Sequence, residues 1–159
     1  MLILVLPASK ILKMIEDRKN WLSILAKAKA KDLKKYWNKV KNLPDYKVLR
    51  APEIGGVMVQ GRLGATGDPF NLGEMTVTRC SVQLETGEIG HGYIQGREKE
   101  AAKRVAVLDA IMQGPRQREI DLLVIAPLAE LFNKEKKAKA KKAAATKVEF
   151  FTMARGKNK

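Results

Sequence analysis

The sequence predicts an α+β fold: N-terminal helices, an antiparallel sheet of about four strands, a long helix, and a C-terminal helix followed by an extended aromatic tail. Two observations carry this prediction. Apolar residues recur at helical spacing before residue 44 and again over residues 97–113, whereas residues 46–95 show the apolar–polar alternation of strands. Consecutive strands joined by short glycine-containing turns pair antiparallel. At 159 residues, a single domain is expected.

Three apolar stripes at helical spacing come before the strands, in residues 8–18, 21–28 and 33–40. The second and third stripes each contain a tryptophan. We interpret both tryptophans as core or interface residues, because large aromatic side chains are highly buried on average. Pro44 ends this helical region, since proline cannot continue a helix.

The sheet is predicted from four short strands, at residues 46–50, 57–63, 74–85 and 89–95. Gly87 lies in a short turn between the last two strands and can adopt a positive φ. Within the last strand, Gly90 and Gly92 share a face with Ile94. Two glycines on one strand face indicate that another element approaches that face closely.

The helix at residues 97–113 has acids in its first turn and ends at Gly114–Pro115. Residues 120–126 form a continuous apolar run, which is typical either of a buried strand or of the end of a helix. Residues 128–146 favour a helix by composition. The lysine-rich second half of that segment has no apolar stripe, so we expect water to surround it.

The chain ends in a basic segment that contains two phenylalanines and a methionine, V-E-F-F-T-M-A-R-G. A cluster of large apolar side chains is not expected to remain in water. We therefore predict that this segment docks on the domain or on another subunit. The predicted interface residues are Phe150, Phe151, Met153 and Arg155.

Charge and cysteine content restrict the possible functions. The net charge is +14, but it is divided into +9 over residues 1–50, −3 over residues 51–133 and +8 over residues 134–159. Basic flanks around a slightly acidic centre suit an acidic partner or simple solubility. The single cysteine excludes an intrachain disulfide and a cysteine-based zinc or iron–sulfur site within the chain. We expect no cofactor and no metal.

The N-terminal run M-L-I-L-V-L-P lacks the basic start of a signal peptide, and its apolar stretch is short. No run in the sequence approaches the ~18 apolar residues that a membrane-spanning helix needs. We therefore expect a cytoplasmic protein that does not bind a membrane.

The segment G-R-L-G-A-T-G-D-P-F at residues 61–70 is a glycine-rich loop between two predicted strands. Backbone N–H groups around Gly64, Thr66 and Gly67 can be presented to an anion. The segment is not a P-loop, because it lacks the Lys–Ser/Thr pair and does not lead into a helix. Two interpretations remain open: a hairpin connection, or a loop that contacts an anion or a partner.

Arg62 and Arg79 fall on the same predicted strand face. Two guanidinium groups on an open sheet face can hold a phosphate or a carboxylate. The alternative is that each arginine forms an ion pair with an acid nearby in the sequence, for which Glu53, Asp68 and Glu74 are the candidates.

The chain shows no pattern of catalytic residues. A triad of Ser81, His91 and Asp109 can be drawn, but the spacing of these residues does not support it. No cluster of metal ligands is visible, and Cys80 is interpreted as a small buried residue of a strand. These observations favour a non-catalytic or accessory subunit, or a binding module.

The sequence resembles the family of small G subunits (PhnG) of the bacterial phosphonate carbon–phosphorus lyase system. The resemblance covers residues 19–159 in order, whereas residues 1–18 are predicted to be an N-terminal extension of this single domain. The runs that carry the resemblance are W-L-S-I-L-A at 21–26, R-A-P-E-I-G-G-V-M-V-Q-G-R-L-G-A-T-G-D-P-F-N-L-G-E-M-T-V-T-R at 50–79, T-G-E-I-G-H-G-Y-I-Q-G-R at 86–97, A-V-L-D-A-I-M-Q at 106–113, I-A-P-L at 125–128 and F-F-T-M-A-R-G at 150–156.

The resemblance implies a role in a multi-subunit assembly with the H, I and J subunits of the same system, and possibly the L subunit. Such an assembly transfers the ribose triphosphate part of ATP to an alkylphosphonate and displaces adenine. The resemblance implies that the chemistry belongs to other subunits, since nucleosidase chemistry is expected in the I subunit and the radical cluster in the J subunit. Arg62, Arg79 and Arg97 lie in the shared runs and are candidates for anion or partner contact only.

The alternative function is a small basic nucleic-acid-binding protein. The net negative sheet region argues against it, because sheet-based nucleic-acid binding uses basic strands interleaved with aromatic residues. We therefore expect no nucleic acid among the partners.

Overall fold

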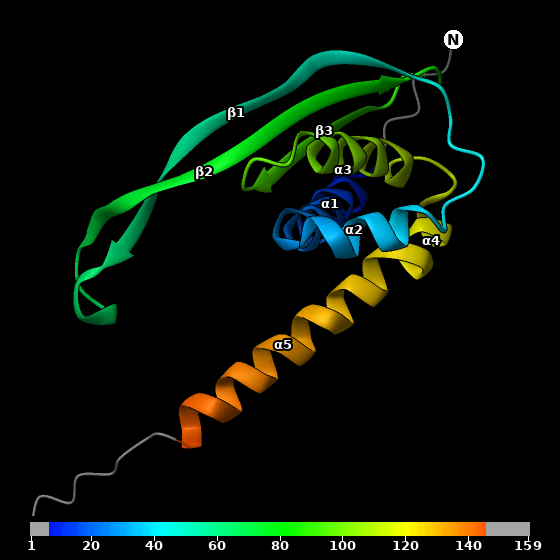
Figure 1. The fold of residues 1–159 in the computed structure, drawn as a ribbon. Coiled ribbons are helices and arrows are strands. Elements are labelled where there is room, and N and C mark those ends of the chain that lie inside the picture. Colours follow the sequence, from blue (N-terminus) through cyan, green and yellow to red (C-terminus); the bar gives the residue numbers. More distant parts are fainter. Residues whose placement is uncertain (1–6, 146–159) are drawn as a thin grey trace, which may run out of the picture.

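Figure 1 shows the computed structural model of the chain, which describes residues 7–145. The fold is α+β, as predicted. The predicted aromatic tail lies outside the described residues. The elements, in chain order, are α1 (Ala8–Lys27), α2 (Ala30–Trp37), β1 (Tyr46–Arg62), the 3-10 turn η1 (Leu63–Ala65), β2 (Pro69–Leu84), β3 (Ile89–Gln95), α3 (Lys99–Met112), α4 (Gln117–Ile120), the π-helical turn η2 (Asp121–Ile125) and α5 (Ala126–Ala145).

The described residues form one antiparallel sheet in the order β1–β2–β3. It has three strands rather than about four, because the strands predicted at 46–50 and 57–63 are two parts of the continuous strand β1. The pairing of β1 with β2 continues past Pro52 because the register shifts between Val48 and Arg50 and between Arg50 and Glu53. An edge strand tolerates a proline there, because the missing N–H group need not belong to the ladder.

Helix α3 packs directly on β3, and the close approach predicted from the two glycines is confirmed. A Cβ atom at Gly90 would lie 1.9 Å from the carbonyl oxygen of Ala106, and one at Gly92 would lie 1.9 Å from that of Ala102. Both alanines are fully buried. Glycine on the strand and alanine on the helix therefore bring the two backbones into contact.

Helices α1 and α2 form a second layer below α3 (Figure 1). The first two predicted stripes belong to one helix, α1, and Trp21 is buried as predicted. The core between the layers is continuous; its largest fully buried apolar side chains are Leu25, Leu33, Val82, Val105, Val107, Leu108, Ile120 and Val124.

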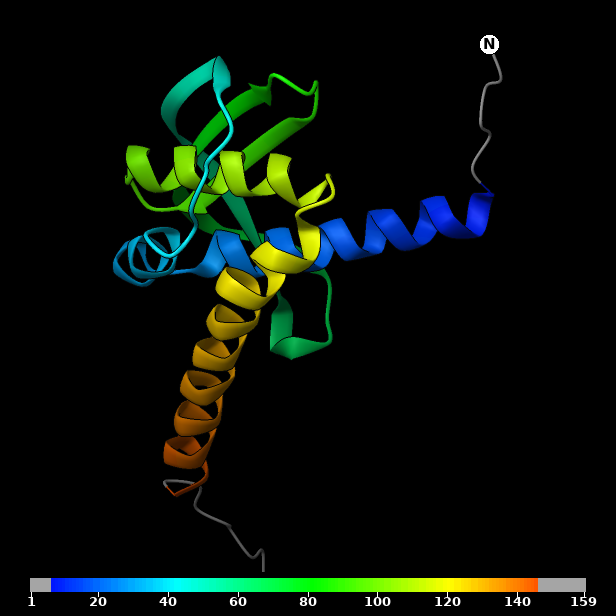
Figure 2. The ribbon, with the colours of Figure 1, turned by 90° about the vertical axis from the view of Figure 1, so that its right-hand side faces the viewer.

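Residues 117–145 are helical throughout, which decides between the two interpretations of residues 120–126 in favour of a helix. The π-helical turn buries Val124 and Ile125 side by side. Beyond Phe132, α5 is exposed on every side, as its composition predicts. Figure 2 shows α5 leaving the body of the molecule.

The boundary predicted between residues 18 and 19 falls inside α1. Arg18 reaches the sheet and forms an ion pair with Asp109 of α3. The N-terminal half of α1 projects from the body (Figure 2), and Leu12, Met14 and Ile15 are exposed there. Arg18 is therefore anchored to the rest of the fold.

Candidate partner interface

A two-stranded ribbon projects from the sheet. Strand β3 pairs with β2 only from Val77 to Gln83, whereas β1 and β2 remain paired as far as Arg62 and Pro69. Residues 56–76 therefore form an arm that extends beyond the three-stranded part of the sheet and beyond α3 (Figure 1). From Gly56 to Arg62 the arm is about 20 Å long at the usual rise of a strand.

The arm exposes large apolar side chains to water. Met58, Leu63 and Leu72 are 60 %, 72 % and 66 % exposed. Phe70 is also exposed, as is Ile54 at the base of the arm. A two-stranded ribbon is at best marginally stable in water on its own. A Cβ atom at Gly61 would lie 3.3 Å from Phe70 and 3.7 Å from Leu72, so these two apolar side chains lie on the same face of the ribbon. A cluster of exposed apolar side chains of this kind marks a contact site for another molecule. The arm is therefore the strongest candidate for a partner interface among the described residues.

The glycine-rich loop forms the tip of the arm and has the geometry of a hairpin connection. Gly64 and Ala65 adopt positive φ values of 55° and 71°. The N–H group of Gly67 donates to the carbonyl oxygen of Leu63 at 2.7 Å, so it is already used within the loop. A Cβ atom at Gly67 would lie 2.6 Å from the same oxygen, which explains the glycine. Thr66 is exposed at the tip.

The structure does not bring the three candidate arginines together. Arg62 lies at the tip, where it donates to the carbonyl oxygen of Gly67 at 3.3 Å. Arg79 lies ten residues along β2 from Pro69, the register partner of Arg62, which is about 33 Å along a strand. Arg97 is exposed just after β3, at the base of the arm.

Arg79 forms an ion pair with Glu53, which is one of the alternatives considered from the sequence. The Nε–Oε2 distance is 3.5 Å. Glu53 also accepts a closer contact from Arg50, at 2.8 Å between Nη2 and Oε2. The hydrogen bond from Arg50 and, to a smaller extent, the charge of Arg79 lower the pKa of the Glu53 carboxyl group. All three side chains are exposed.

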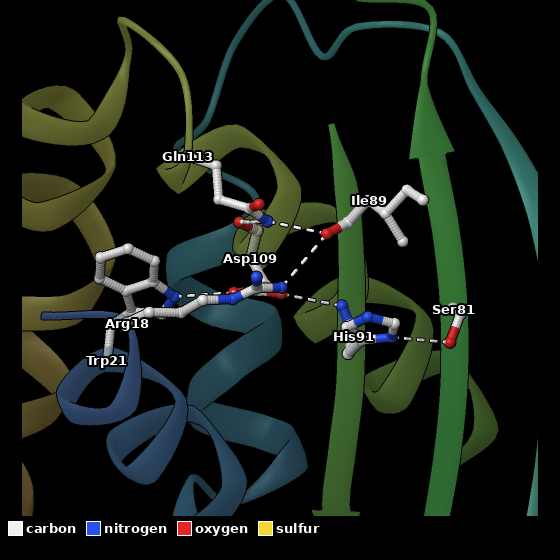
Figure 3. Close-up of polar contacts among 7 residues, drawn as sticks. All are labelled: Arg18, Trp21, Ser81, Ile89, His91, Asp109 and Gln113. Carbon is white, nitrogen blue, oxygen red and sulfur yellow. Dashed lines mark hydrogen bonds and ion pairs between the residues drawn. The ribbon is translucent and has the colours of Figure 1, made fainter. Parts of the chain in front are cut away.

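A buried carboxylate holds α1, β3 and α3 together (Figure 3). The side chain of Asp109 is completely buried in α3. It accepts hydrogen bonds from Arg18 Nη2 at 2.7 Å, from Trp21 Nε1 at 2.9 Å and from the backbone N–H group of His91 at 2.8 Å. A buried carboxylate is tolerated only when it is paired and hydrogen-bonded in this way.

The same cluster covers the outer edge of β3. The carbonyl oxygen of Ile89 accepts from Gln113 Nε2 at 2.8 Å and from Arg18 Nη2 at 3.2 Å, while the neighbouring N–H group of His91 is bonded to Asp109. Side chains of α1 and α3 thus satisfy groups that an added strand would otherwise use.

The catalytic triad that can be drawn from the sequence does not form. Ser81 Oγ lies 3.0 Å from His91 Nδ1 on exposed side chains, but Asp109 bonds the backbone of His91 and not its ring. Cys80 is buried near Arg50, and burial raises the pKa of its thiol. Among residues 7–145 there is no group of three or more potential metal ligands, and no helix is long and apolar enough to cross a membrane.

Sequence patterns pointed to Asp109 only as a possible member of a triad, and they did not point to Arg18 and Trp21 as its partners. One signal was available: Asp109 interrupts a run of buried apolar residues from Val105 to Met112. A carboxylate in such a position requires partners. Nothing in the sequence places those partners in α1, 88 and 91 residues away.

Comparison with known proteins identifies the family. A family model described as "Phosphonate metabolism protein PhnG" matches residues 16–156, which include Arg18, the arm and α5. The alpha-D-ribose 1-methylphosphonate 5-triphosphate synthase subunit PhnG of Rhizobium meliloti (strain 1021) is 40 % identical over 144 residues, which are 91 % of this chain and 92 % of the relative. The chain therefore belongs to the PhnG family of phosphonate metabolism proteins.

Proposed function

We propose that this chain is an assembly subunit of an enzyme complex that transfers the ribose triphosphate part of ATP to an alkylphosphonate, with adenine displaced. Family membership carries the proposal, because the relative that is 40 % identical is itself named a subunit of ribose 1-methylphosphonate 5-triphosphate synthase. The partners that we propose are the H, I and J subunits of the same system, and possibly the L subunit.

The structure supports a role in which this chain contributes an interaction surface to the complex rather than reactive side chains. In the reaction, the bond between C1′ of the ribose and adenine breaks, and a bond from C1′ to a phosphonate oxygen forms. A step of this kind needs groups that stabilise the developing charge at the reacting atoms. The polar cluster around Asp109 is fully occupied by contacts within the fold. The exposed arm, in contrast, has the character of an interface.

Six residues are proposed as anion or partner contacts. The loop at the tip of the arm presents four of them, Arg62, Gly64, Thr66 and Gly67, to any molecule that the arm contacts. Arg79 would contribute as part of its ion pair with Glu53. Arg97 lies separately at the base of the arm.

The proposed function is tested by omission. Purified subunits of the system are mixed with ATP and methylphosphonate, with and without this chain, and released adenine is measured by chromatography. We expect adenine release to require the chain. Undiminished release without it would contradict the proposal. If the chain instead copurifies with nucleic acid, and high salt or nuclease removes that nucleic acid, the alternative of a basic nucleic-acid-binding protein would be favoured.

A second prediction concerns the aromatic tail. Helix α5 is about 30 Å long and carries the chain away from the body (Figure 2). We infer that a partner subunit buries Phe150 and Phe151, because large apolar side chains are not expected to remain in water. Buried aromatic residues often dominate the energy of an interface. We expect the double substitution F150A/F151A to release the chain from its complex on a sizing column.

The matched control for the tail is the double substitution K157A/K159A, which changes the same segment without removing an aromatic side chain. We expect it to leave the complex intact. Equal retention of both double variants in the complex would show that the aromatic residues do not anchor the interface.

A further inference from the structure

The two edges of the sheet differ in how they are protected. Side chains of Arg18, Asp109 and Gln113 hydrogen-bond the outer edge of β3 at Ile89 and His91. Strand β1 forms the other edge, and no hydrogen bond within residues 7–145 reaches the outer side of residues 54–61. Proteins usually block such an edge, because unpaired N–H and C=O groups pair with another chain.

The hydrogen bonds and register of the sheet identify which backbone groups of β1 face outward. The N–H group of Leu84 donates toward β3, to Glu88, and the carbonyl oxygen of Thr76 accepts from Gly96, so even-numbered residues of β2 face β3. Odd-numbered residues of β2 therefore face β1, and Val77 and Met75 are paired with Gly55 and Val57. It follows that the N–H and C=O groups of Ile54, Gly56 and Met58 point away from β2.

The composition of this edge indicates the chemistry of its partner. Residues 54–61 read I-G-G-V-M-V-Q-G and contain no charge, although the chain as a whole carries +14. Lysine and proline, which usually blunt an edge, are absent from this segment. Ile54 and Met58 are exposed on one face, and Val57 and Val59 are partly exposed on the other. The segment is suited to an uncharged, apolar strand.

We propose that the outer edge of β1 from Ile54 to Met58 binds an extended, uncharged apolar segment of another subunit of the synthase, which becomes the fourth strand of the sheet. This inference rests on the proposed function. In strand addition, main-chain hydrogen bonds supply affinity and side chains on alternate faces supply specificity. The added strand also supplies the packing that the two-stranded arm lacks.

Hydrogen exchange tests the proposal directly. Amide exchange is measured for the free chain and for the complex purified with the other subunits. We expect the amides of Ile54, Gly56 and Met58 to exchange at least about tenfold more slowly in the complex than in the free chain, because strand addition gives them acceptors. The amide of Val57, which faces β2, serves as the internal control and should already be protected in the free chain.

Two variants of Met58 distinguish the contribution of its backbone N–H group to binding from that of its side chain. Met58→Pro removes an outward N–H group without removing a ladder bond to β2, whereas Met58→Thr removes the apolar side chain and keeps the N–H group. We expect Met58→Pro to weaken binding about tenfold more than Met58→Thr, since it leaves a partner carbonyl unpaired. The circular dichroism of each free variant verifies that the fold remains.

The outcomes are distinct. Unchanged exchange at Ile54, Gly56 and Met58 in an intact complex would overturn the strand-addition proposal and leave the proposed function standing. Protection of the same amides in the free chain that grows with concentration would also overturn it, and would assign the edge to a second copy of this chain. Failure of the unaltered chain to form a complex would overturn both proposals.

Discussion

Asp109→Ala is expected to lower the free energy of unfolding by about 3 kcal/mol. The substitution removes the acceptor of Arg18 and leaves the N–H groups of Trp21 and His91 without a partner inside the fold. A buried donor left unpaired costs more than the hydrogen bond contributed. The loss is measured by urea denaturation of the purified chain.

Asp121→Ala is the matched control for this prediction. Asp121 is also a helical aspartate, but its side chain is exposed. Substitution of an exposed residue away from special features usually changes stability by no more than about 0.5 kcal/mol. If Asp109→Ala cost no more than Asp121→Ala, the cluster in Figure 3 would not hold α1 on the sheet.

Gly92→Ala is expected to have an effect of similar size, about 3 kcal/mol of lost stability. Its new Cβ atom would lie 1.9 Å from the carbonyl oxygen of Ala102, which belongs to a helix backbone and cannot rotate away. Helix α3 would have to move off β3 and open the core. Thermal unfolding followed by circular dichroism measures the loss.

Gly73→Ala controls for the loss of glycine from a strand. Gly73 lies in β2 within the arm, and no atom lies within 4 Å of the position that a Cβ atom would occupy. We expect the melting temperature of the Gly73→Ala variant to equal or slightly exceed that of the unaltered chain, because alanine reduces the conformational freedom of the unfolded state. Equal effects of the two substitutions would contradict the contact between α3 and β3.

Sequence patterns predicted the parts of the fold that depend on local signals. The helix predicted at 97–113 is α3, and the strand predicted at 89–95 is β3 with the same bounds. The two glycines of β3 also indicated which face of that strand another element approaches, and that element is α3. Continuity of β1 was not predictable in this way. Pro52 and Gly55–Gly56 locally resemble a break, and only pairing with distant residues of β2 holds them in one strand.

The site was less predictable, because its contacts join distant segments. Alternation along strands placed Arg62 and Arg79 on one face, but it contained no information on the length of the ribbon between them. The ion pair of Arg79 with Glu53 depends on register, which bulges in β1 shift. The exposure of the arm could not be deduced from its apolar residues, since the same residues in a covered sheet would form a core.

The proposed role in an assembly is tested most directly by coexpression of this chain with the other subunits of its phosphonate system, followed by purification through a tag on this chain alone. We expect one stable complex that contains the I-type subunit and elutes well ahead of the lone 17.7 kDa chain on a sizing column. A well-behaved monomer without bound subunits would contradict this role.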